Sequence, residues 1–469
     1  MLTASVNATD TPDNILNETE ITNNDFTALS QDINNASQSK YIKLTKDYDY
    51  DTQSDGNYTD GITVNIDDLV IDGQNHTVNG KNHARIFYIH SKNVVLKNIK
   101  IINCNSNSNG GAINWQGDNG TISNSVFINN TSPNSGGAIF IKNTVNVKNS
   151  IFSSNTAYFG GAISLETQSS VDNCIFENNF ATFLGGGIYS GEQTKIFNSQ
   201  FIKNKAGDGG GAYFHYQGLI ENSVFNDNIA IGYGGAITNE YNVNIKSSNF
   251  TNNSAKYAGS IYFKGNGIVE KSIFSENTAD LGGAIYTTCD KIEIISSEFN
   301  FNEAKQASSL HITSKNAYIE NATFNNINVS YDSEINLKSD NPTLINLTYN
   351  NVAKKPAITE NKTEKTSVKT TKPITKKKTT IKAKSKTFNR NKKIKKYIIT
   401  LKSGNTALKN RKIILKLKNK TYTAITKKNG QATFKIKLTK KGKYKAKITF
   451  KGDKLYESSK KTVYIKIKK

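Results

Sequence analysis

Acidic side chains recur at one position of a repeat in this chain of 469 residues. Carboxyl groups about 5–9.5 Å apart can hydrolyse a glycosidic bond, and stacked β-coils rise about 4.8 Å each. Glu221 and Glu270 stand two repeats apart and meet that spacing, with Lys246 between them. Alternation of acid and Lys is typical of cross-coil charge pairing. We interpret the column as structural charge and keep a catalytic pair as the alternative. The column, four residues before each of a series of Phe, reads Lys148, Asp172, Phe197, Glu221, Lys246, Glu270, Ile295 and Glu320.

A second series of side chains that could bind a ligand follows Gly-Gly-Ala-Ile and its looser versions. If the Ile points inward, its successor points outward, and exposed rings could stack on sugar rings or on a partner. The alternative is that the turn tilts these rings into the core. The series is Asn114, Phe140, Ser164, Tyr189, Phe214, Thr238, Tyr262 and Tyr286, and its candidate ligand-binding residues are Phe140, Tyr189, Phe214, Tyr262 and Tyr286.

Four closely spaced acids offer the hard oxygen ligands that Ca²⁺ prefers. They are Asp47, Asp49, Asp51 and Asp55. The glycine of an EF-hand loop is missing, so we interpret them as an exposed acidic loop. The five His show no metal-ligand spacing, and the three Cys are too scattered for a zinc site or a disulfide framework. We therefore expect no cofactor.

The elements that must position these residues repeat every 24 or 25 residues, which is the mark of a solenoid. A Val or Ile stands five residues before each Phe, an Asn stands three after all but the last, and the small-residue turn separates the units. These anchor points predict three strands per coil, hence a right-handed parallel β-helix of about 12 coils over residues 62–352. The Phe series is Phe127, Phe152, Phe176, Phe201, Phe225, Phe250, Phe274, Phe299 and Phe324.

The open end of a solenoid exposes apolar core and unpaired backbone, so a cap is needed there. Phe26, Leu29 and Ile33 have helical spacing, and Asp25 is available as an N-cap. The sequence predicts a disordered segment over residues 1–24, then a capping helix with the first strands over residues 25–61.

The charge of the chain is divided unevenly. Residues 354–469 hold 40 of the 61 Lys and Arg but only four of the 38 acids, a formal charge of +36, so the preceding residues carry −13. Residues 353–378 read as a self-repelling Thr/Lys/Pro linker. Alternating apolar positions then predict a small all-β sandwich over residues 379–469. Its Lys are accompanied neither by Arg side chains that could bind phosphate bidentately nor by aromatic residues that could stack on bases. This argues against nucleic acid as the partner and favours an anionic cell-wall polymer.

Repeated Gly-Gly-Ala-Ile together with Phe-x-x-Asn resembles the repeat pair of chlamydial polymorphic outer-membrane proteins, and more closely the adhesin-like surface proteins of methanogenic archaea. Residues 71–80, Ile-Asp-Gly-Gln-Asn-His-Thr-Val-Asn-Gly, look like the segment that precedes the repeats in those proteins. Residues 419–430 and the later Gly442-Lys-Tyr and Gly452-Asp-Lys-Leu-Tyr look like the bacterial-type Ig-like domain often attached to them. The resemblance implies a surface role in attachment and supplies no binding residues.

The sequence thus predicts a non-catalytic, extracellular adhesin-like protein that attaches to glycans or surface proteins of other cells. Abundant Asn-x-Ser/Thr sequons suit a secreted chain, and we expect that a secretion signal is missing from this sequence or was removed. No run of 18 apolar residues could span a membrane. The alternative function is a β-helical polysaccharide lyase or glycoside hydrolase.

Overall fold

The computed structural model describes residues 24–325, 335–350, 368–370, 377–391, 394–418, 420–452 and 456–468. The chain divides into two compact units, Met1–Thr370 and Thr371–Lys469. Most of the segment predicted to be disordered and most of the predicted linker lie outside the described residues. One part of that linker, β43 (Val368–Thr370), is a strand and pairs in parallel with β42 (Leu347–Asn350). This part of the predicted linker therefore joins the solenoid sheet, whose last coil leaves an edge open to pairing.

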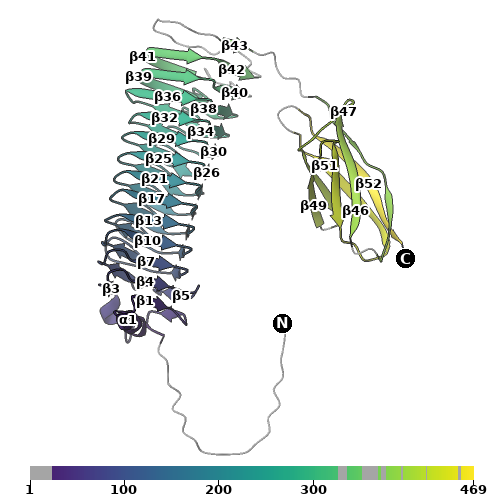
Figure 1. Cartoon of the computed structure of the whole chain (residues 1–469). Coiled ribbons are helices and arrows are strands. Elements are labelled where there is room, and N and C mark those ends of the chain that lie inside the picture. The colour runs from purple at the N-terminus through teal and green to yellow at the C-terminus, as the bar shows by residue number, and fades with distance from the viewer. Residues whose placement is uncertain are drawn as a thin grey trace, which may run out of the picture. The chain divides into compact units, whose positions relative to one another are not determined.

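The first unit is a parallel β-helix, as predicted (Figure 1). Two ladders of short strands form one sheet, and they merge in the long strands β39 (Leu310–Glu320) and β41 (Ile335–Ile345). The first ladder follows the small-residue turn: β3 (Ile62–Val64), β6 (Phe87–Ile89), β9 (Ile113–Trp115), β12 (Ile139–Ile141), β16 (Ile163–Leu165), β20 (Ile188–Ser190), β24 (Ala212–Phe214), β28 (Ile237–Asn239), β31 (Ile261–Phe263) and β35 (Ile285–Thr287). The second ladder carries the acidic column: β1 (Tyr41–Lys43), β4 (Val70–Asp72), β7 (Val95–Lys97), β10 (Gly120–Ser123), β13 (Val145–Lys148), β17 (Ser169–Asp172), β21 (Thr194–Phe197), β25 (Gly218–Glu221), β29 (Val243–Lys246), β32 (Gly267–Glu270) and β36 (Lys291–Ile295).

Two further faces complete each coil. The first of them, which we call the Phe face, carries the Phe series and ends in β42 and β43. The strands before these are β2 (Tyr48–Asp49), β5 (Thr77–Asn79), β8 (Lys100–Ile102), β11 (Val126–Ile128), β14 (Ile151–Ser153), β18 (Ile175–Glu177), β22 (Gln200–Ile202), β26 (Val224–Asn226), β30 (Asn249–Thr251), β33 (Ile273–Ser275), β37 (Glu298–Asn300) and β40 (Thr323–Asn325). The last face precedes the small-residue turn and is interrupted: β15 (Thr156–Phe159), β19 (Phe180–Leu184), β23 (Lys205–Ala206) and β27 (Ile229–Ala230), then β34 (Thr278–Leu281) and β38 (Glu303–Gln306).

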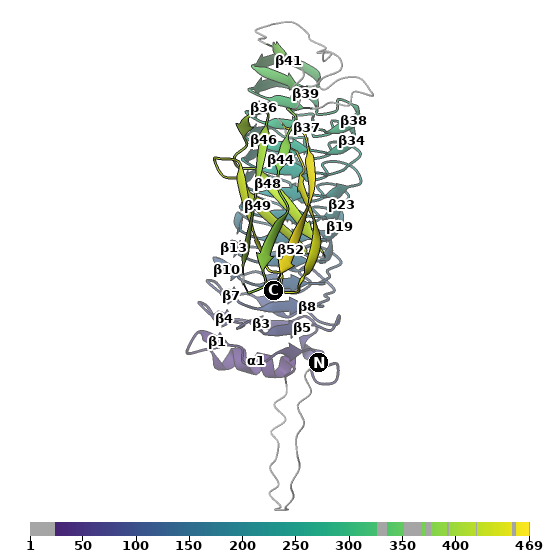
Figure 2. The same cartoon turned by 90° about the vertical axis from the view of Figure 1, so that its right-hand side faces the viewer.

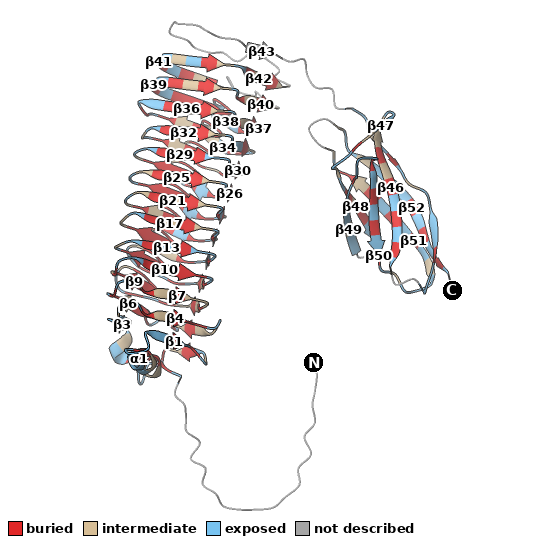
Figure 3. Cartoon of the chain, viewed as in Figure 1, coloured by how far each residue is buried: buried red, intermediate tan, exposed pale blue. Residues whose placement is uncertain are grey.

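The Phe and Asn residues that mark the repeat are scaffold. Successive Phe rings stack inside the coil, with centroids 4.5–5.0 Å apart from Phe127 to Phe324. The Asn three residues after each Phe from Phe127 to Phe299 is buried. In Asn155, for example, the side-chain amide donates to the Asn of the next coil and to a backbone carbonyl. Buried polar groups that are fully paired in this way fix one register between coils. Figure 3 shows the buried residues running through the inside of every coil.

The glycine pairs are required by close approach between coils. Gly136 has a φ of +69°, a conformation that favours glycine. A Cβ on the next residue, Gly137, would lie 2.1 Å from the carbonyl oxygen of Gly161 one coil further on. The turn therefore admits no side chain at its second position.

Helix α1 (Phe26–Asn35) lies beneath the first coil (Figures 1 and 2). The predicted N-cap is confirmed, since Asp25 accepts a hydrogen bond from the amide of Ala28 at 2.8 Å. A short 3₁₀ helix, η1 (Gly56–Tyr58), follows the acidic loop. Buried Phe26, Leu29 and Ile33 join the solenoid core, so the helix covers the apolar end of the stack.

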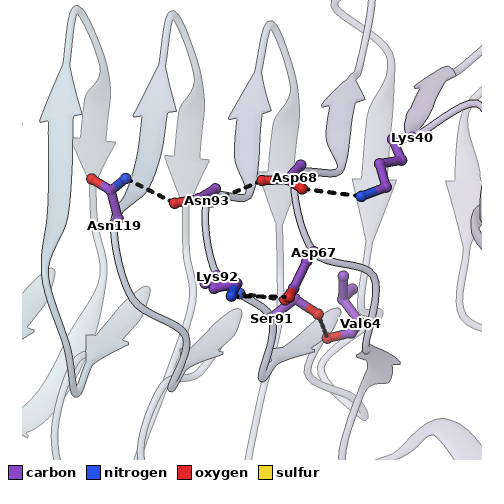
Figure 4. A network of polar contacts seen from close by, with 8 residues as sticks. All are labelled: Lys40, Val64, Asp67, Asp68, Ser91, Lys92, Asn93 and Asn119. Carbon is purple, nitrogen blue, oxygen red and sulfur yellow. Dashed lines mark hydrogen bonds and ion pairs between the residues drawn. The ribbon is translucent and has the colours of Figure 1, made fainter.

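Polar side chains at the turns form ladders of their own, which Figure 4 shows for the first coils. Lys40 pairs with Asp68 at 3.0 Å, Asn93 donates to the other oxygen of Asp68 at 2.8 Å, and Asn119 donates to Asn93 at 2.8 Å. The hydrogen bond from Asn93 is the main reason that the pKa of Asp68 is lowered. These ladders tie the exposed edges of successive coils together.

The second unit is a β-sandwich with its own core, which includes Leu401, Leu415 and Ile448. One sheet contains β44 (Thr380–Lys382), β46 (Lys395–Ser403), β47 (Thr406–Ala407) and β50 (Gln431–Ile436). The other contains β45 (Lys386–Asn389), β52 (Ser459–Lys468), β51 (Gly442–Phe450), β48 (Lys412–Leu417) and β49 (Lys420–Ile425). Along β51 buried residues alternate with exposed Lys, so the outer surface of that strand is basic.

Candidate functional site: an aromatic strip beside an acidic hub

Aromatic rings gather where the interrupted face meets the first ladder. The middle residues of successive first-ladder strands pair across coils, as Tyr189 with Tyr213 and Tyr262 with Tyr286. Rings from the segment before each turn pack against them, and the centroids of Tyr233 and Tyr262 are 4.5 Å apart. We call this set the aromatic strip: Phe159, Tyr189, Tyr213, Tyr233, Tyr257, Tyr262 and Tyr286.

Most rings of the strip are half-buried, and they are held by each other. Tyr189, Tyr262 and Tyr286 are of intermediate exposure, whereas Tyr213 is only 6% exposed. The hydroxyl of Tyr262 lies 2.9 Å from that of Thr288. Burial raises the pKa of both Tyr262 and Tyr286. The rings are thus neutral and packed on one another, and all of them except Tyr213 keep part of the side chain open to solvent, where a ligand could contact them.

Two of the five predicted ligand-binding residues are not available to a ligand. Phe140 belongs to the predicted column but is 6% exposed. Its neighbours in the column, Asn114 and Ser164, are buried as well, so this end of the column is covered. This prediction is wrong for Phe140.

Phe214 is fully buried and lies in a different column from the one predicted. Its strand places Ala212 where the other coils have Ile, so Tyr213 pairs with Tyr189, and Phe214 pairs with Ser190. A Cβ on Gly218 would lie 2.7 Å from the ring of Phe214, which therefore fills the space that this glycine leaves. The correct aromatic residue of this coil is Tyr213.

A carboxylate hub flanks the strip, two residues beyond the aromatic column. Glu240 accepts a hydrogen bond from Lys264 at 2.8 Å, and Nδ1 of His215 lies 2.7 Å from its other oxygen. Burial opposes the ionisation of Glu240, but bonds from Lys264 and the Tyr213 hydroxyl lower its pKa below the usual value. Burial and Glu240 together raise the pKa of Tyr213. A charged acceptor, an ammonium group and hydroxyls therefore lie beside the rings, the groups that bind sugar hydroxyls.

A second acid lies on the other side of the strip. Asp208 accepts a bond from the amide of Tyr233 at 2.7 Å, and burial raises its pKa. Between Tyr213 and Tyr262 the aromatic column is broken by Thr238, whose hydroxyl donates to the carbonyl of Tyr233 at 2.8 Å. The small side chain leaves the rings of Tyr213 and Tyr262 on either side of one coil.

The acidic column of the second ladder has the predicted register. Glu221 pairs with Lys246, and Lys246 with Glu270, on successive coils. Glu270 lies 3.8 Å from Lys246 and also contacts Lys271, and both Lys lower its pKa. The structure thus pairs Glu270 with cations, as the interpretation of structural charge requires.

The four acids of the predicted loop do not converge. Asp55 is fully buried, and its carboxylate accepts from the amides of Phe26, Thr27 and Asp51, each at 2.9 Å. Asp47 binds the amide of Thr77 at 2.8 Å, while Asp49 lies 3.3 Å from Lys81. Within the described residues, no group of three or more His, Cys, Asp or Glu could hold a metal ion. The interpretation as an exposed loop is wrong for Asp55, which holds the start of α1.

Several residues of the site were not predicted. Tyr233 and Tyr257 come directly before the small-residue turn, whereas the sequence prediction considered only the residues that follow it. His215 and Glu240 each follow an inward-pointing residue, Phe214 and Asn239, which pair across the coils. They therefore point outward, as do Tyr213 and Thr238 two residues before them. That alternation was the signal that could have found them.

The free cysteines Cys104, Cys174 and Cys289 are buried. Cys174 stands two residues before Phe176, where other coils have Ser, and its amide donates to Ser199 Oγ at 3.1 Å. No helix in the described part of the chain is long and apolar enough to cross a membrane.

Comparison with known proteins agrees with the repeat. Residues 124–142 and 271–288 match the model of the Chlamydia polymorphic membrane protein repeat. No curated protein matches the chain. Among solved structures, a mutant tailspike protein of E. coli bacteriophage HK620 in complex with a pentasaccharide is similar, with 12% identity and a TM-score of 0.39 over 93% of this chain and 88% of that one. The first unit is a solenoid, and two short stretches of it are similar to the polymorphic membrane protein repeat.

Proposed function

We propose that this protein is a non-catalytic, adhesin-like protein of the cell surface, which attaches to glycans or to surface proteins of other cells through the aromatic strip. The observation that carries this proposal is the row of half-buried Tyr rings beside the Glu240 hub. Rigid rings lose little conformational entropy on binding, and the hub supplies fixed partners for hydroxyl groups.

We interpret the second unit as an Ig-like domain that docks on an anionic cell-wall polymer. Residues 371–469 contain two acids, Asp453 and Glu457, among many Lys. Such an excess of positive charge attracts polyanions, and salt weakens the attraction. The repeat pair and this basic domain together support two parts of the proposal: that the protein is extracellular, and that it is an adhesin-like protein of an archaeon.

A glycan array with the full chain, combined with an assay for released reducing sugars, tests the proposal. We expect binding to a restricted set of glycans without product. Turnover of a bound glycan would contradict a non-catalytic role, and the absence of binding to any glycan or to cells would contradict attachment.

The second candidate function is a polysaccharide hydrolase, and one observation favours it. Asp208 and Glu240 flank the break at Thr238, and burial holds the pKa of Asp208 up while bonds hold that of Glu240 down. Two carboxyl groups whose pKa values are shifted in opposite directions are typical of a general acid and a general base in catalysis. If sugars are released, Asp208→Asn should abolish turnover, whereas Glu221→Gln and Glu270→Gln should not.

A further inference from the structure

One end of the sandwich contains a pocket of about 500 Å³. It lies where the β48–β49 turn meets the connection from β50 to β51. Its volume is within the range of pockets that hold small ligands, about 300–1,000 Å³. The lining residues are Leu417, Lys418, Lys420, Lys437, Leu438, Thr439, Lys440 and Tyr444.

The charge of this pocket is not compensated by the protein. Four of its eight lining residues are Lys and none is acidic. None of these four Lys forms an ion pair with another described residue. Like charges on concave walls focus a positive potential, so an anion entering the pocket would relieve the repulsion among the four ammonium groups.

Part of the pocket is apolar and preorganised. The ammonium of Lys418 lies over the ring of Tyr444, 4.9 Å from its centroid. The Tyr444 hydroxyl donates to the carbonyl of Lys440 at 2.8 Å, which ties the β50–β51 connection to the pocket floor. Leu417 is buried and Leu438 is half-buried. A bare inorganic anion would leave these apolar walls without a contact, whereas a sugar ring presents both C–H groups and a charged substituent.

We propose that this pocket binds one acidic sugar unit of an anionic polysaccharide, with its carboxylate or phosphate among Lys418, Lys437 and Lys440. The inference rests on the proposed docking of the second unit on a cell-wall polymer and makes it specific. Docking then depends on these three lysines at one end of the sandwich, rather than on the net charge of the whole domain.

The test compares two double variants of the full chain that remove equal charge. Lys437→Gln with Lys440→Gln changes the pocket, while Lys460→Gln with Lys461→Gln changes exposed residues of β52 outside it. Binding is measured to polygalacturonate, a carboxylate polymer, and to a glycerol-phosphate teichoic acid, at about 0.15 M salt, where exposed charges are screened beyond about 8 Å.

We expect the pocket variant to lose about tenfold or more in affinity, about 1.4 kcal/mol, for one of the two polymers, and the β52 variant to lose about twofold at most, as expected of a distant screened charge. The polymer that shows this difference identifies the anionic group. Equal losses in both variants would overturn the pocket while leaving wall docking intact. Failure of the unaltered chain to bind either polymer would overturn both.

Discussion

The side-chain amide nitrogen of Asn179 donates to the side-chain oxygen Oδ1 of Asn204 on the next coil at 2.9 Å, and the backbone amide of Asn179 donates to the same oxygen at 3.0 Å. Asn204 in turn donates to the carbonyl of Phe176 at 2.9 Å. Both Asn side chains are buried. One amide thus satisfies three groups on the preceding coil, and this arrangement repeats along the stack.

Replacing Asn204 should therefore destabilise the solenoid. Asn204→Ala removes three hydrogen bonds to buried groups of the preceding coil, and an unmade buried bond costs about 1–3 kcal/mol. We therefore expect a loss of about 3 kcal/mol or more in the free energy of unfolding. Asn198→Gly is the control, because it removes an exposed amide and keeps a positive φ. Urea denaturation compares them, and equal midpoints would show that the buried ladder contributes nothing special.

The N-terminal helix should depend on Asp55 rather than on a metal ion. Asp55→Ala removes the acceptor for the amides of Phe26, Thr27 and Asp51, and we expect faster hydrogen exchange at these amides with a loss of about 2 kcal/mol or more. Asp51→Ala removes only the bond to the amide of Gln53 and should change little. Protection that requires added Ca²⁺ would contradict this role.

Asp72 should make the first coils sensitive to acid. It accepts from Asn98 at 2.9 Å and Tyr41 at 3.0 Å and lies 3.2 Å from Lys97, and although burial opposes ionisation these contacts lower its pKa. A lowered pKa contributes stability above the unfolded value, about 3.9, and loses it as the pH falls through the folded pKa. Asp72→Asn should thus destabilise by about 2 kcal/mol at pH 7, as expected for hydrogen bonds to a charged group.

The pH dependence separates this effect from a simple packing defect. The difference between Asp72→Asn and the unaltered chain should shrink below about pH 4, where carboxyls protonate. Denaturation at neutral and acidic pH measures it. A difference that is constant with pH would show that the carboxylate charge is not involved.

The scaffold could be predicted because each coil repeats the same physical constraint. The Phe, Asn and Gly residues recur every 24 or 25 residues. In coils of either length the rings stack on the next coil and the Asn amides bond to it, so the same residue types are required at these positions. The acidic column from Lys148 to Glu320 has its predicted register for the same reason.

The binding surface could be predicted only in part, because it lies where the repeat varies. In the coil with Ala212, Gly211 and Ala212 stand where other coils have Ala and Ile, so reading by motif alone placed Phe214 instead of Tyr213 in the aromatic column. Asp55 was interpreted as exposed because its partners, the first amides of α1, lie nearly 30 residues away in sequence. Contacts of this range leave no local pattern.

Binding by the aromatic strip is measured most directly with two matched variants and one glycan selected on the array. Tyr262→Ala with Tyr286→Ala removes two rings of the strip. Phe301→Asn removes a ring that is 49% exposed elsewhere, at a positive-φ turn position where Asn103 and Asn252 stand in other coils. Isothermal titration should show a loss of affinity of about tenfold or more, about 1.4 kcal/mol, for the double variant and no change for Phe301→Asn. Equal affinity of all three proteins, each folded by its unfolding midpoint, would contradict attachment through the strip.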